Sequence, residues 1–338
     1  MLNSMNRKFY AWILVSLCLL VACSPKLEYQ YAEGKIYGTY YHISYEASQN
    51  MNEELWQEMN RINASLSMFN RSSVISRINN NESDSVDSLF CRMFDLAKKV
   101  NQVSGGLYDI TVAPLVNAWG FGFKKESFPD SARIDSLRLL VGMDKIALKE
   151  GRLIKQLPGI QMDASSIAKG LGVDLAAEYL EAKGVVNYMV EIGGEVRVKG
   201  NSNKKRAWRI GIDRPEDDVT AQSRELQMVL ELNSGALATS GNYRNFYVRE
   251  GKKYAHTISP LTGYPIQTEV LGASVYAPSC MEADAYATAF MVMGLQNAKQ
   301  VIMADSDLEG CLIYEENGVL KTWVSEGLKK RILSEEEK

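Results

Sequence analysis

The chain has 338 residues, of which 46% are hydrophobic and 23% are charged, and its formal net charge is −3 at pH 7. This composition is typical of a globular protein with a sizeable core and excludes a disordered adaptor. The slightly negative charge argues against nucleic acid as a partner, because duplex binding requires a basic surface.

The first 23 residues have the pattern of an exported bacterial lipoprotein. A short basic head precedes an apolar run over residues 11–21, which is too short for a transmembrane helix and has the length of a signal-peptide core. The run ends in Leu20-Val21-Ala22-Cys23, with a small residue before the cut and a thiol to carry a lipid. An ordinary signal peptide with an incidental cysteine is the alternative.

These features predict a signal peptide over residues 1–22, a lipid on Cys23 and a tether over residues 23–33. The protein is then expected on the extracytoplasmic face of the bacterial cell envelope, anchored to a membrane. The mature chain would keep three more cysteines, Cys91, Cys280 and Cys311. Because this number is odd and C-x-x-C spacing is absent, we expect these cysteines to be buried as small apolar residues.

Beyond the tether, the hydrophobic pattern predicts one α+β domain over residues 34–333. Apolar residues recur at helical spacing in four segments, which are residues 52–66, 88–104, 165–183 and a helix from about residue 282. Alternating runs predict a strand at residues 35–47, or a hairpin that turns near Gly38, and strands at residues 185–192, 196–199, 208–212 and 226–232. Two more strands are predicted within residues 310–324, joined by an Asn-Gly turn at Asn317-Gly318. Hairpin signals are frequent and regular βαβ alternation is absent, so we expect a mixed, largely antiparallel sheet with packed helices.

The sequence lacks the common phosphate-loop, dinucleotide-binding and hydrolase motifs, and two histidines are too few for a histidine metal cluster. His42 lies on an alternating strand and is expected to be structural. His256 lies in a turn-rich loop over residues 254–265 and is a candidate general base, because imidazole titrates near neutrality. A loop histidine bonded only to the backbone is the alternative.

Two helical segments carry further candidates. Asp284 and Thr288 have i, i+4 spacing, which places both oxygen ligands on one helix face, as Mg²⁺ binding would require. Residues 162–170 open a helix whose N–H groups favour an anion, with Lys169 within reach. The alternative for the first pair is a helix-start aspartate and a threonine bonded to its own helix.

Glycine-bearing turns at residues 191–195 and 238–243 would let the backbone approach a phosphate, or are simply turns. The aromatic segment over residues 108–122 suits stacking on a planar ligand, or core packing. Metal ligands, an anion cradle, aromatic platforms and a single base together predict a site for a nucleotide or dinucleotide pyrophosphate.

In order and spacing these segments resemble the ApbE family, the FAD:protein FMN transferases, from about Gly34 to Gly310. The motifs that carry the resemblance are Tyr37-Gly-Thr39, Ser67-Met-Phe69, Ser76-Arg-Ile-Asn79, Asp109-Ile-Thr-Val-Ala-Pro114, Trp119-Gly-Phe-Gly122, Asp163 to Gly170, Gly193-Gly194, Thr239 to Tyr243, His256 to Gly263 and Ala283 to Thr288. The resemblance implies an FAD site between two interlocked lobes. It also implies a Mg²⁺-dependent enzyme that transfers FMN from FAD to a threonine of a partner protein, releasing AMP.

Roles follow from the resemblance by position. The implied Mg²⁺ ligands are the backbone carbonyl of Ser166, the side chains of Asp284 and Thr288, and Ala287. The implied FAD-binding residues are Tyr37, Phe69, Ala118, Trp119, Gly120, Asp163, Lys169 and Ile258. His256 would deprotonate the acceptor threonine.

The sequence departs from the family pattern in four places. Ser259 stands before the proline of the histidine loop, where an acid is usual. Tyr37 replaces a methionine and Phe69 a tyrosine, and both keep a ring able to pack on a ligand. The run Asp163-Ala-Ser-Ser166 replaces a Leu-Gly-rich run, a change that a backbone ligand tolerates.

Two other functions remain open at this point. An FAD pyrophosphatase would use water in place of the threonine, and a surface flavin-binding protein would not turn FAD over. The intact pair of Asp284 and Thr288 argues against passive binding, which needs no metal at the pyrophosphate. A tethered transferase reaches only protein surfaces near its own membrane, so the expected acceptors are extracytoplasmic domains of membrane redox flavoproteins.

Overall fold

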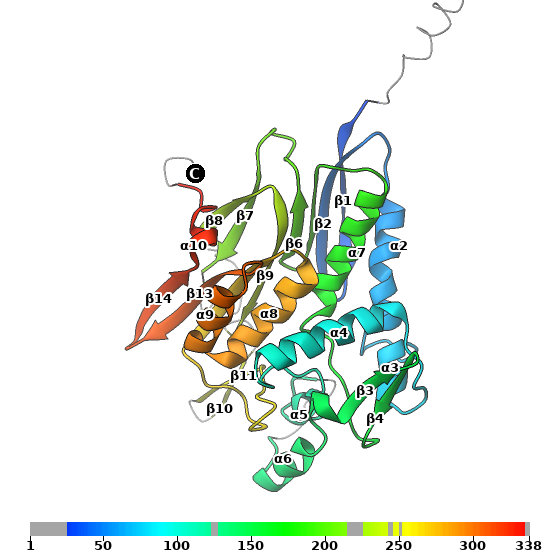
Figure 1. Cartoon of the computed structure of the whole chain (residues 1–338), viewed down its shortest axis with the longest axis vertical. Helices are drawn as coiled ribbons and strands as arrows, with labels where there is room; N and C mark the ends of the chain where they lie inside the picture. The colour runs from blue at the N-terminus through cyan, green and yellow to red at the C-terminus, as the bar shows by residue number, and fades with distance from the viewer. Residues whose placement is uncertain (1–25, 123–127, 215–225, 243–245, 250–251, 335–338) are drawn as a thin grey trace, which may run out of the picture.

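The computed structural model describes residues 26–122, 128–214, 226–242, 246–249 and 252–334 (Figure 1). The predicted signal peptide and Cys23 lie outside this part of the chain. Within it, no helix is long and apolar enough to span a bilayer. The cysteines at positions 91, 280 and 311 are free, and the second and third of them are buried, as expected, whereas Cys91 is only partly buried.

The described chain is built around an eight-stranded sheet in which every neighbouring pair is antiparallel. In spatial order the strands are β1 (Glu28–Ile36), β2 (Thr39–Ala47), β5 (Tyr188–Ile192), β6 (Glu195–Lys199), β9 (Ser234–Gly241), β12 (Val270–Ala277), β13 (Glu309–Glu316) and β14 (Val319–Val324). Three separate hairpins pair β3 (Ile146–Lys149) with β4 (Arg152–Lys155), β7 (Trp208–Asp213) with β8 (Leu226–Leu232), and β10 (Phe246–Arg249) with β11 (Lys252–Ala255). The predicted α+β class with a largely antiparallel sheet is confirmed.

Helices cover one face of this sheet (Figure 1). The helices of the described chain are α2 (Asn52–Ser65), α3 (Val74–Asn79), α4 (Ser88–Val103), α5 (Ala113–Ala118), α6 (Ser131–Arg138), the 3₁₀ turn η1 (Met143–Lys145), α7 (Ala168–Ala182), α8 (Cys280–Met293), α9 (Leu295–Ala304) and α10 (Glu326–Lys329). The last of them, α10, packs on the other side, where its Leu328 joins the core under the β7–β8 hairpin. Helix α8 packs on β9 and β12 and lies beside α7. Ten of its fourteen residues are buried, which explains why apolar residues are not confined to one side of the helix.

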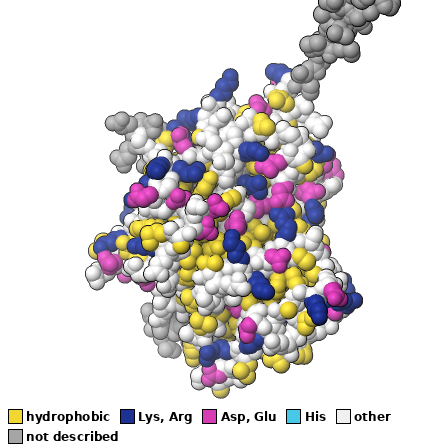
Figure 2. Space-filling view, viewed as in Figure 1, with side chains coloured by type: hydrophobic (Ala, Val, Ile, Leu, Met, Phe, Trp, Pro, Cys, Tyr) yellow, Lys and Arg dark blue, Asp and Glu magenta, His cyan; other side chains and the backbone are white. Residues whose placement is uncertain are grey.

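Side-chain alternation decides which face of each strand is buried. On β2, Tyr41, Ile43 and Tyr45 point toward the helices and are buried, whereas Tyr40 and His42, on the other face, are exposed. The opposite face of β6, β9 and β13 packs against the β7–β8 hairpin, so the sheet has a core on both sides in its middle. On the face seen in Figure 2, acidic and basic side chains are interspersed.

The structure corrects three expectations. Residues 28–33 are not tether but the first part of β1, because they pair with β2 in register from Glu28 opposite Ala47 and bury Ala32. The helix expected from residue 165 begins at Ala168, after an Asp163 side chain has accepted the Ser165 N–H and closed a turn. Residues 238–241 are the end of β9 rather than a turn.

Candidate active site

A cavity of about 720 Å³ opens where the two glycines of the β5–β6 turn, the end of β9, the start of α7 and one face of α8 meet. It brings together seven of the residues predicted from sequence, namely Asp163, Ser166, Lys169, His256, Ile258, Asp284 and Thr288. The volume and the mixed polar lining suit a ligand of nucleotide size.

Asp284 ties α8 to the start of α7. Its Oδ2 atom accepts a hydrogen bond of 2.9 Å from the backbone N–H of Gly170, and its side chain is buried. In a regular helix the Gly170 N–H would bond to the carbonyl of Ser166, four residues earlier. Because that N–H donates to Asp284 instead, the Ser166 carbonyl is left available for another partner.

The residues present fit a divalent metal ion. One turn beyond Asp284, the Thr288 hydroxyl lies 3.0 Å from the Ser240 hydroxyl at the cavity wall. A carboxylate, a hydroxyl and a free carbonyl are hard oxygen donors of the kind that Mg²⁺ prefers, and a ligand phosphate with water would complete its octahedron. Burial raises the pKa of Asp284, partly offset by Lys169, and a bound cation would keep this carboxylate charged.

Lys169 and the buried Glu195 form an ion pair on the cavity wall. Lys169 Nζ lies 2.6 Å from Glu195 Oε1, and the Glu195 side chain is only 3% exposed. Burial would lower the pKa of Lys169, but the carboxylates of Asp284 and Glu195 raise it overall, so the lysine stays cationic. Burial raises the pKa of Glu195 to about 7, although Lys169 opposes the change.

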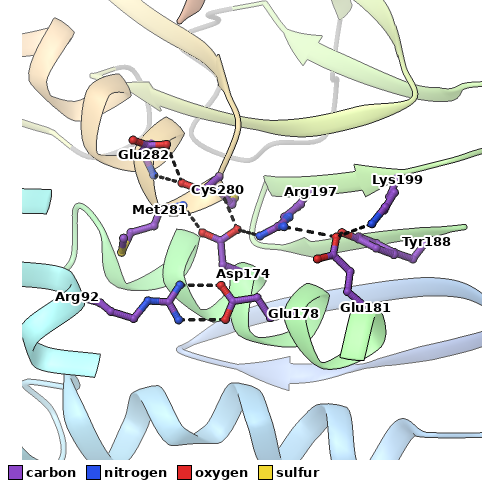
Figure 3. A network of polar contacts seen from close by, with 11 residues as sticks. Arg92, Asp174, Glu178, Glu181, Tyr188, Arg197, Lys199, Cys280, Met281 and Glu282 are labelled. Atoms are coloured by element: carbon purple, nitrogen blue, oxygen red, sulfur yellow. Dashed lines mark hydrogen bonds and ion pairs between the residues drawn. The ribbon is translucent and has the colours of Figure 1, made fainter. Parts of the chain in front are cut away.

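A second buried carboxylate, that of Asp174, also joins α7 to α8 (Figure 3). Asp174, on α7, accepts hydrogen bonds from the backbone N–H groups of Cys280 at 2.9 Å and Met281 at 2.8 Å, the first two residues of α8. Arg197 on β6 pairs with the same carboxylate at 2.8 Å. Thus α7 supplies an anion to the N-terminus of α8, and α8 supplies Asp284 to the start of α7.

Gly170 permits this close contact. A side chain there would collide with the backbone carbonyl of Cys280, so only glycine lets the two helices approach. The Ser279 hydroxyl accepts the Glu282 N–H and completes the cap of α8. The face of α8 that lines the cavity is therefore fixed by backbone contacts as well as by side chains.

The histidine loop reaches the cavity as a compact turn. Its two arms are joined by the Ser259 N–H bond to the Tyr264 carbonyl at 2.9 Å and by the Ile266 N–H bond to the Thr257 carbonyl at 3.0 Å. The Ser259 hydroxyl accepts the Thr262 N–H, so serine serves the turn where the family pattern has an acid. His256 lines the cavity, with its ring 6.4 Å from that of Phe121.

The other predicted FAD contacts do not line the cavity. Ala118 and Trp119 are buried in and beside α5, and the indole N–H of Trp119 donates to the Gly263 carbonyl at 2.8 Å, which supports the histidine loop from behind. Gly120 follows at a positive φ of 81°. From this segment, Val112, Val116 and Phe121 reach the cavity instead.

Tyr37, Phe69 and Ala287 also lie away from the cavity lining. Tyr37 sits at the β1–β2 turn with its hydroxyl bonded to the Met59 carbonyl, and it packs against Gly172 of α7. Phe69 is 79% exposed. Ala287 is fully buried inside α8, next to its cavity-lining neighbour Thr288.

Sequence reasoning missed Glu195 as a site residue. It was visible only as the end of a glycine-bearing turn, whereas the fold buries it beside Lys169 and against the cavity. Arg209 and Asp213 on β7 and Glu191 on β5 also line the cavity and were not predicted. The only available signal was their charge on otherwise apolar strands.

Comparison with known proteins gives a consistent result. A sequence profile of the ApbE family matches residues 37–312. The chain is 36% identical to a FAD:protein FMN transferase of Vibrio cholerae, over 86% of this chain and 90% of the relative. It is also 36% identical to one of Haemophilus influenzae, over 92% and 94%. The solved structure of the flavin transferase ApbE from Vibrio cholerae superposes with a TM-score of 0.79 at 33% identity, covering 90% of this chain and 99% of that one.

Proposed function

Because the chain belongs to the ApbE family, we propose that it is an FAD:protein FMN transferase whose reaction takes place in the cavity beside α8. The curated relatives that it matches over most of their length carry this activity in their names. In the proposed reaction the FMN half of FAD is joined to an acceptor protein and AMP leaves.

The proposed acceptor group is a threonine hydroxyl. Its oxygen attacks the phosphorus on the FMN side of the pyrophosphate, a phosphoester bond forms, and the bond between that phosphorus and the bridging oxygen breaks, so that the electron pair leaves with AMP. The hydroxyl proton passes to His256, the only histidine that lines the cavity among the described residues. A base placed in this way accelerates such a step roughly 10²–10⁴-fold.

The proposed cofactor is Mg²⁺, held by the Asp284 carboxylate, the Thr288 hydroxyl and the Ser166 carbonyl. The single observation that carries this proposal is the Gly170 N–H bond to Asp284, because it orients the carboxylate and frees the carbonyl at the same place. A bound ion would neutralise charge on the pyrophosphate. Lys169, also on the cavity wall, would bind the same anion.

The proposed location is the extracytoplasmic side of a bacterial membrane, with a lipid on Cys23. The sequence Leu20-Val21-Ala22-Cys23 supports this location. The acceptors are then extracytoplasmic domains of membrane redox flavoproteins, since a tethered enzyme reaches only nearby surfaces.

One assay tests the function. The chain from residue 24 onward is incubated with FAD, Mg²⁺ and an acceptor flavoprotein subunit, and the products are analysed by mass spectrometry. FMN attached to an acceptor threonine supports the proposal. Equal release of FMN and AMP with no dependence on acceptor would make the protein an FAD pyrophosphatase, and no turnover of FAD under any condition would leave only a flavin-binding protein.

A further inference from the structure

Glu195 has an oxygen with no partner. Its Oε1 atom is paired with Lys169, but its Oε2 atom is buried and accepts no hydrogen bond. Among the residues that the structure describes, it is the single buried side-chain nitrogen or oxygen in this state. Leaving a charged group partly unsatisfied inside a protein is costly, so such an atom calls for a missing donor.

The missing donor can come from a ligand, because Glu195 belongs to the cavity wall. It follows directly on Gly193 and Gly194, which have φ values of 63° and 105° and form a turn that also lines the cavity. No donor of the described residues makes a hydrogen bond to this oxygen, and the Lys169 ammonium is paired with the other oxygen, Oε1. The atom is therefore placed to receive a hydrogen from whatever fills the cavity.

The chemistry of the proposed substrate limits which of its groups can donate a hydrogen bond to the Oε2 atom of Glu195. The pyrophosphate of FAD carries acceptors only, and its charge is repelled by a carboxylate. The donors nearest to the pyrophosphate in FAD are sugar hydroxyls, on the ribityl chain on one side and on the ribose on the other. Lys169, which touches Glu195, is the residue expected to bind the pyrophosphate, so those hydroxyls lie in the right neighbourhood.

We propose that Glu195 is a substrate-binding residue whose Oε2 atom accepts a hydrogen bond from a sugar hydroxyl next to the pyrophosphate of FAD, while its Oε1 atom holds Lys169 toward the pyrophosphate. One residue would then recognise both the charge and the sugar of the ligand. The inference rests on the proposed function, because it assumes that FAD occupies this cavity.

The proposed role of Glu195 is tested by measuring ligand binding rather than turnover. Dissociation constants are measured by calorimetry at pH 8 with Mg²⁺ for the full-length protein and for Glu195→Gln, with ADP, FMN and inorganic pyrophosphate as probes. ADP carries the ribose hydroxyls, FMN carries the ribityl hydroxyls, and pyrophosphate carries neither. FAD binding in EDTA is measured in parallel by flavin fluorescence, and circular dichroism checks the fold of each variant.

We expect Glu195→Gln to weaken the binding of FAD, and of either ADP or FMN, by about tenfold or more, because a hydrogen bond to a charged acceptor is lost. The dissociation constant of pyrophosphate should stay within about twofold of the parent value. Weaker binding of ADP would place the hydrogen bond at the ribose, and weaker binding of FMN would place it at the ribityl chain. The matched control is Glu178→Gln, an identical change at a residue of α7 that does not line the cavity. Both Glu178 oxygens already have a partner, the guanidinium of Arg92. This control should leave all four constants within about twofold.

Two results would overturn the inference. If the binding of pyrophosphate weakens as much as the binding of ADP and FMN, Glu195 acts only through Lys169. If no constant changes, its free oxygen does not touch the ligand. Should the unaltered protein itself fail to bind FAD, the proposed function fails first and this inference falls with it.

Discussion

The Oδ2 atom of Asp284 lies 2.9 Å from the backbone nitrogen of Gly170, and this bond links the middle of the candidate site to the start of α7. The reciprocal contact lies nearby, where Asp174 of α7 accepts hydrogen bonds from the first two N–H groups of α8. Each helix thus places a carboxylate on backbone donors of the other. The position of the cavity-lining face of α8 depends on both contacts.

Asp284→Asn should abolish Mg²⁺-dependent turnover while preserving the fold. The amide oxygen can still accept the Gly170 N–H, but the charge that binds the cation is gone. We expect a loss of about 100-fold or more in FMN transfer, since the metal contributes several kcal/mol to the transition state. Transfer is measured by mass spectrometry at saturating Mg²⁺, and activity within a few-fold of the parent protein would contradict the metal assignment.

His256→Ala should reduce FMN transfer roughly 10²–10⁴-fold without preventing FAD binding, because a base is lost and the ligand contacts remain. The matched change is His42→Ala. His42 is exposed and pairs with Glu191, so its loss should alter transfer by less than about threefold. Equal loss of transfer in the two variants would remove His256 from its proposed role.

Gly170→Ala should destabilise the protein and impair the site together. The added methyl group meets the Cys280 carbonyl, so α7 and α8 must separate. Overpacking of this kind costs about 1–3 kcal/mol in the free energy of unfolding, measured by urea denaturation. Ala182→Ser adds one atom at an exposed position of the same helix and should stay within about 0.5 kcal/mol. Equal stability of the two variants would show that the close contact between Gly170 and Cys280 is not needed.

Two carboxylates on α7 allow a matched test of burial (Figure 3). Asp174 pairs with Arg197 and is fully buried, whereas Glu178 pairs with Arg92 with both side chains about two-fifths exposed. Asp174→Asn should lower the free energy of unfolding by about 3–5 kcal/mol, because it removes the closer of the two carboxylates that pair with the largely buried Arg197 and leaves only Glu181, at 3.5 Å. Glu178→Gln should cost about 0–1 kcal/mol.

The Asp174→Asn change should also raise the Mg²⁺ concentration needed for half-maximal transfer, because α8 would lose the anchor at its N-terminus. That second readout separates positioning of the metal site from general stability. A variant that is destabilised but has an unchanged Mg²⁺ requirement would show that Asp174 supports the fold alone.

Because burial raises the pKa of Glu195, we expect the stability of the metal-free protein to depend on pH. The pKa of Glu195 is about 7 when folded, against an ordinary value of 4.5, so the folded state holds the proton longer. Stability contributed by this group should therefore be complete below pH 4.5 and decline as the pH rises toward 7. In EDTA, the melting temperature of Glu195→Gln should fall less over this window than that of the parent protein, and parallel curves would contradict the burial argument.

Much of the architecture was readable from the sequence because it depends on local pattern. The alternation from Tyr40 to Tyr45 predicted β2, and the Asn317-Gly318 pair predicted the β13–β14 turn, since each signal is complete within a few residues. The strand over residues 28–33 was missed. Its polar, tether-like composition becomes a strand only by pairing with β2.

The sequence by itself determined which residues could carry the chemistry: the carboxylate and hydroxyl at i, i+4 on α8, a lysine after a helix start, and one histidine in a rigid loop. Their assembly was decided by the tertiary structure alone. No sequence spacing reports that Gly170 gives its N–H to Asp284, or that a turn glutamate, Glu195, is buried beside Lys169 with one oxygen unpaired. Such contacts join residues far apart in the chain, and burial, which sets their strength, exists only after the helices have packed on the sheet.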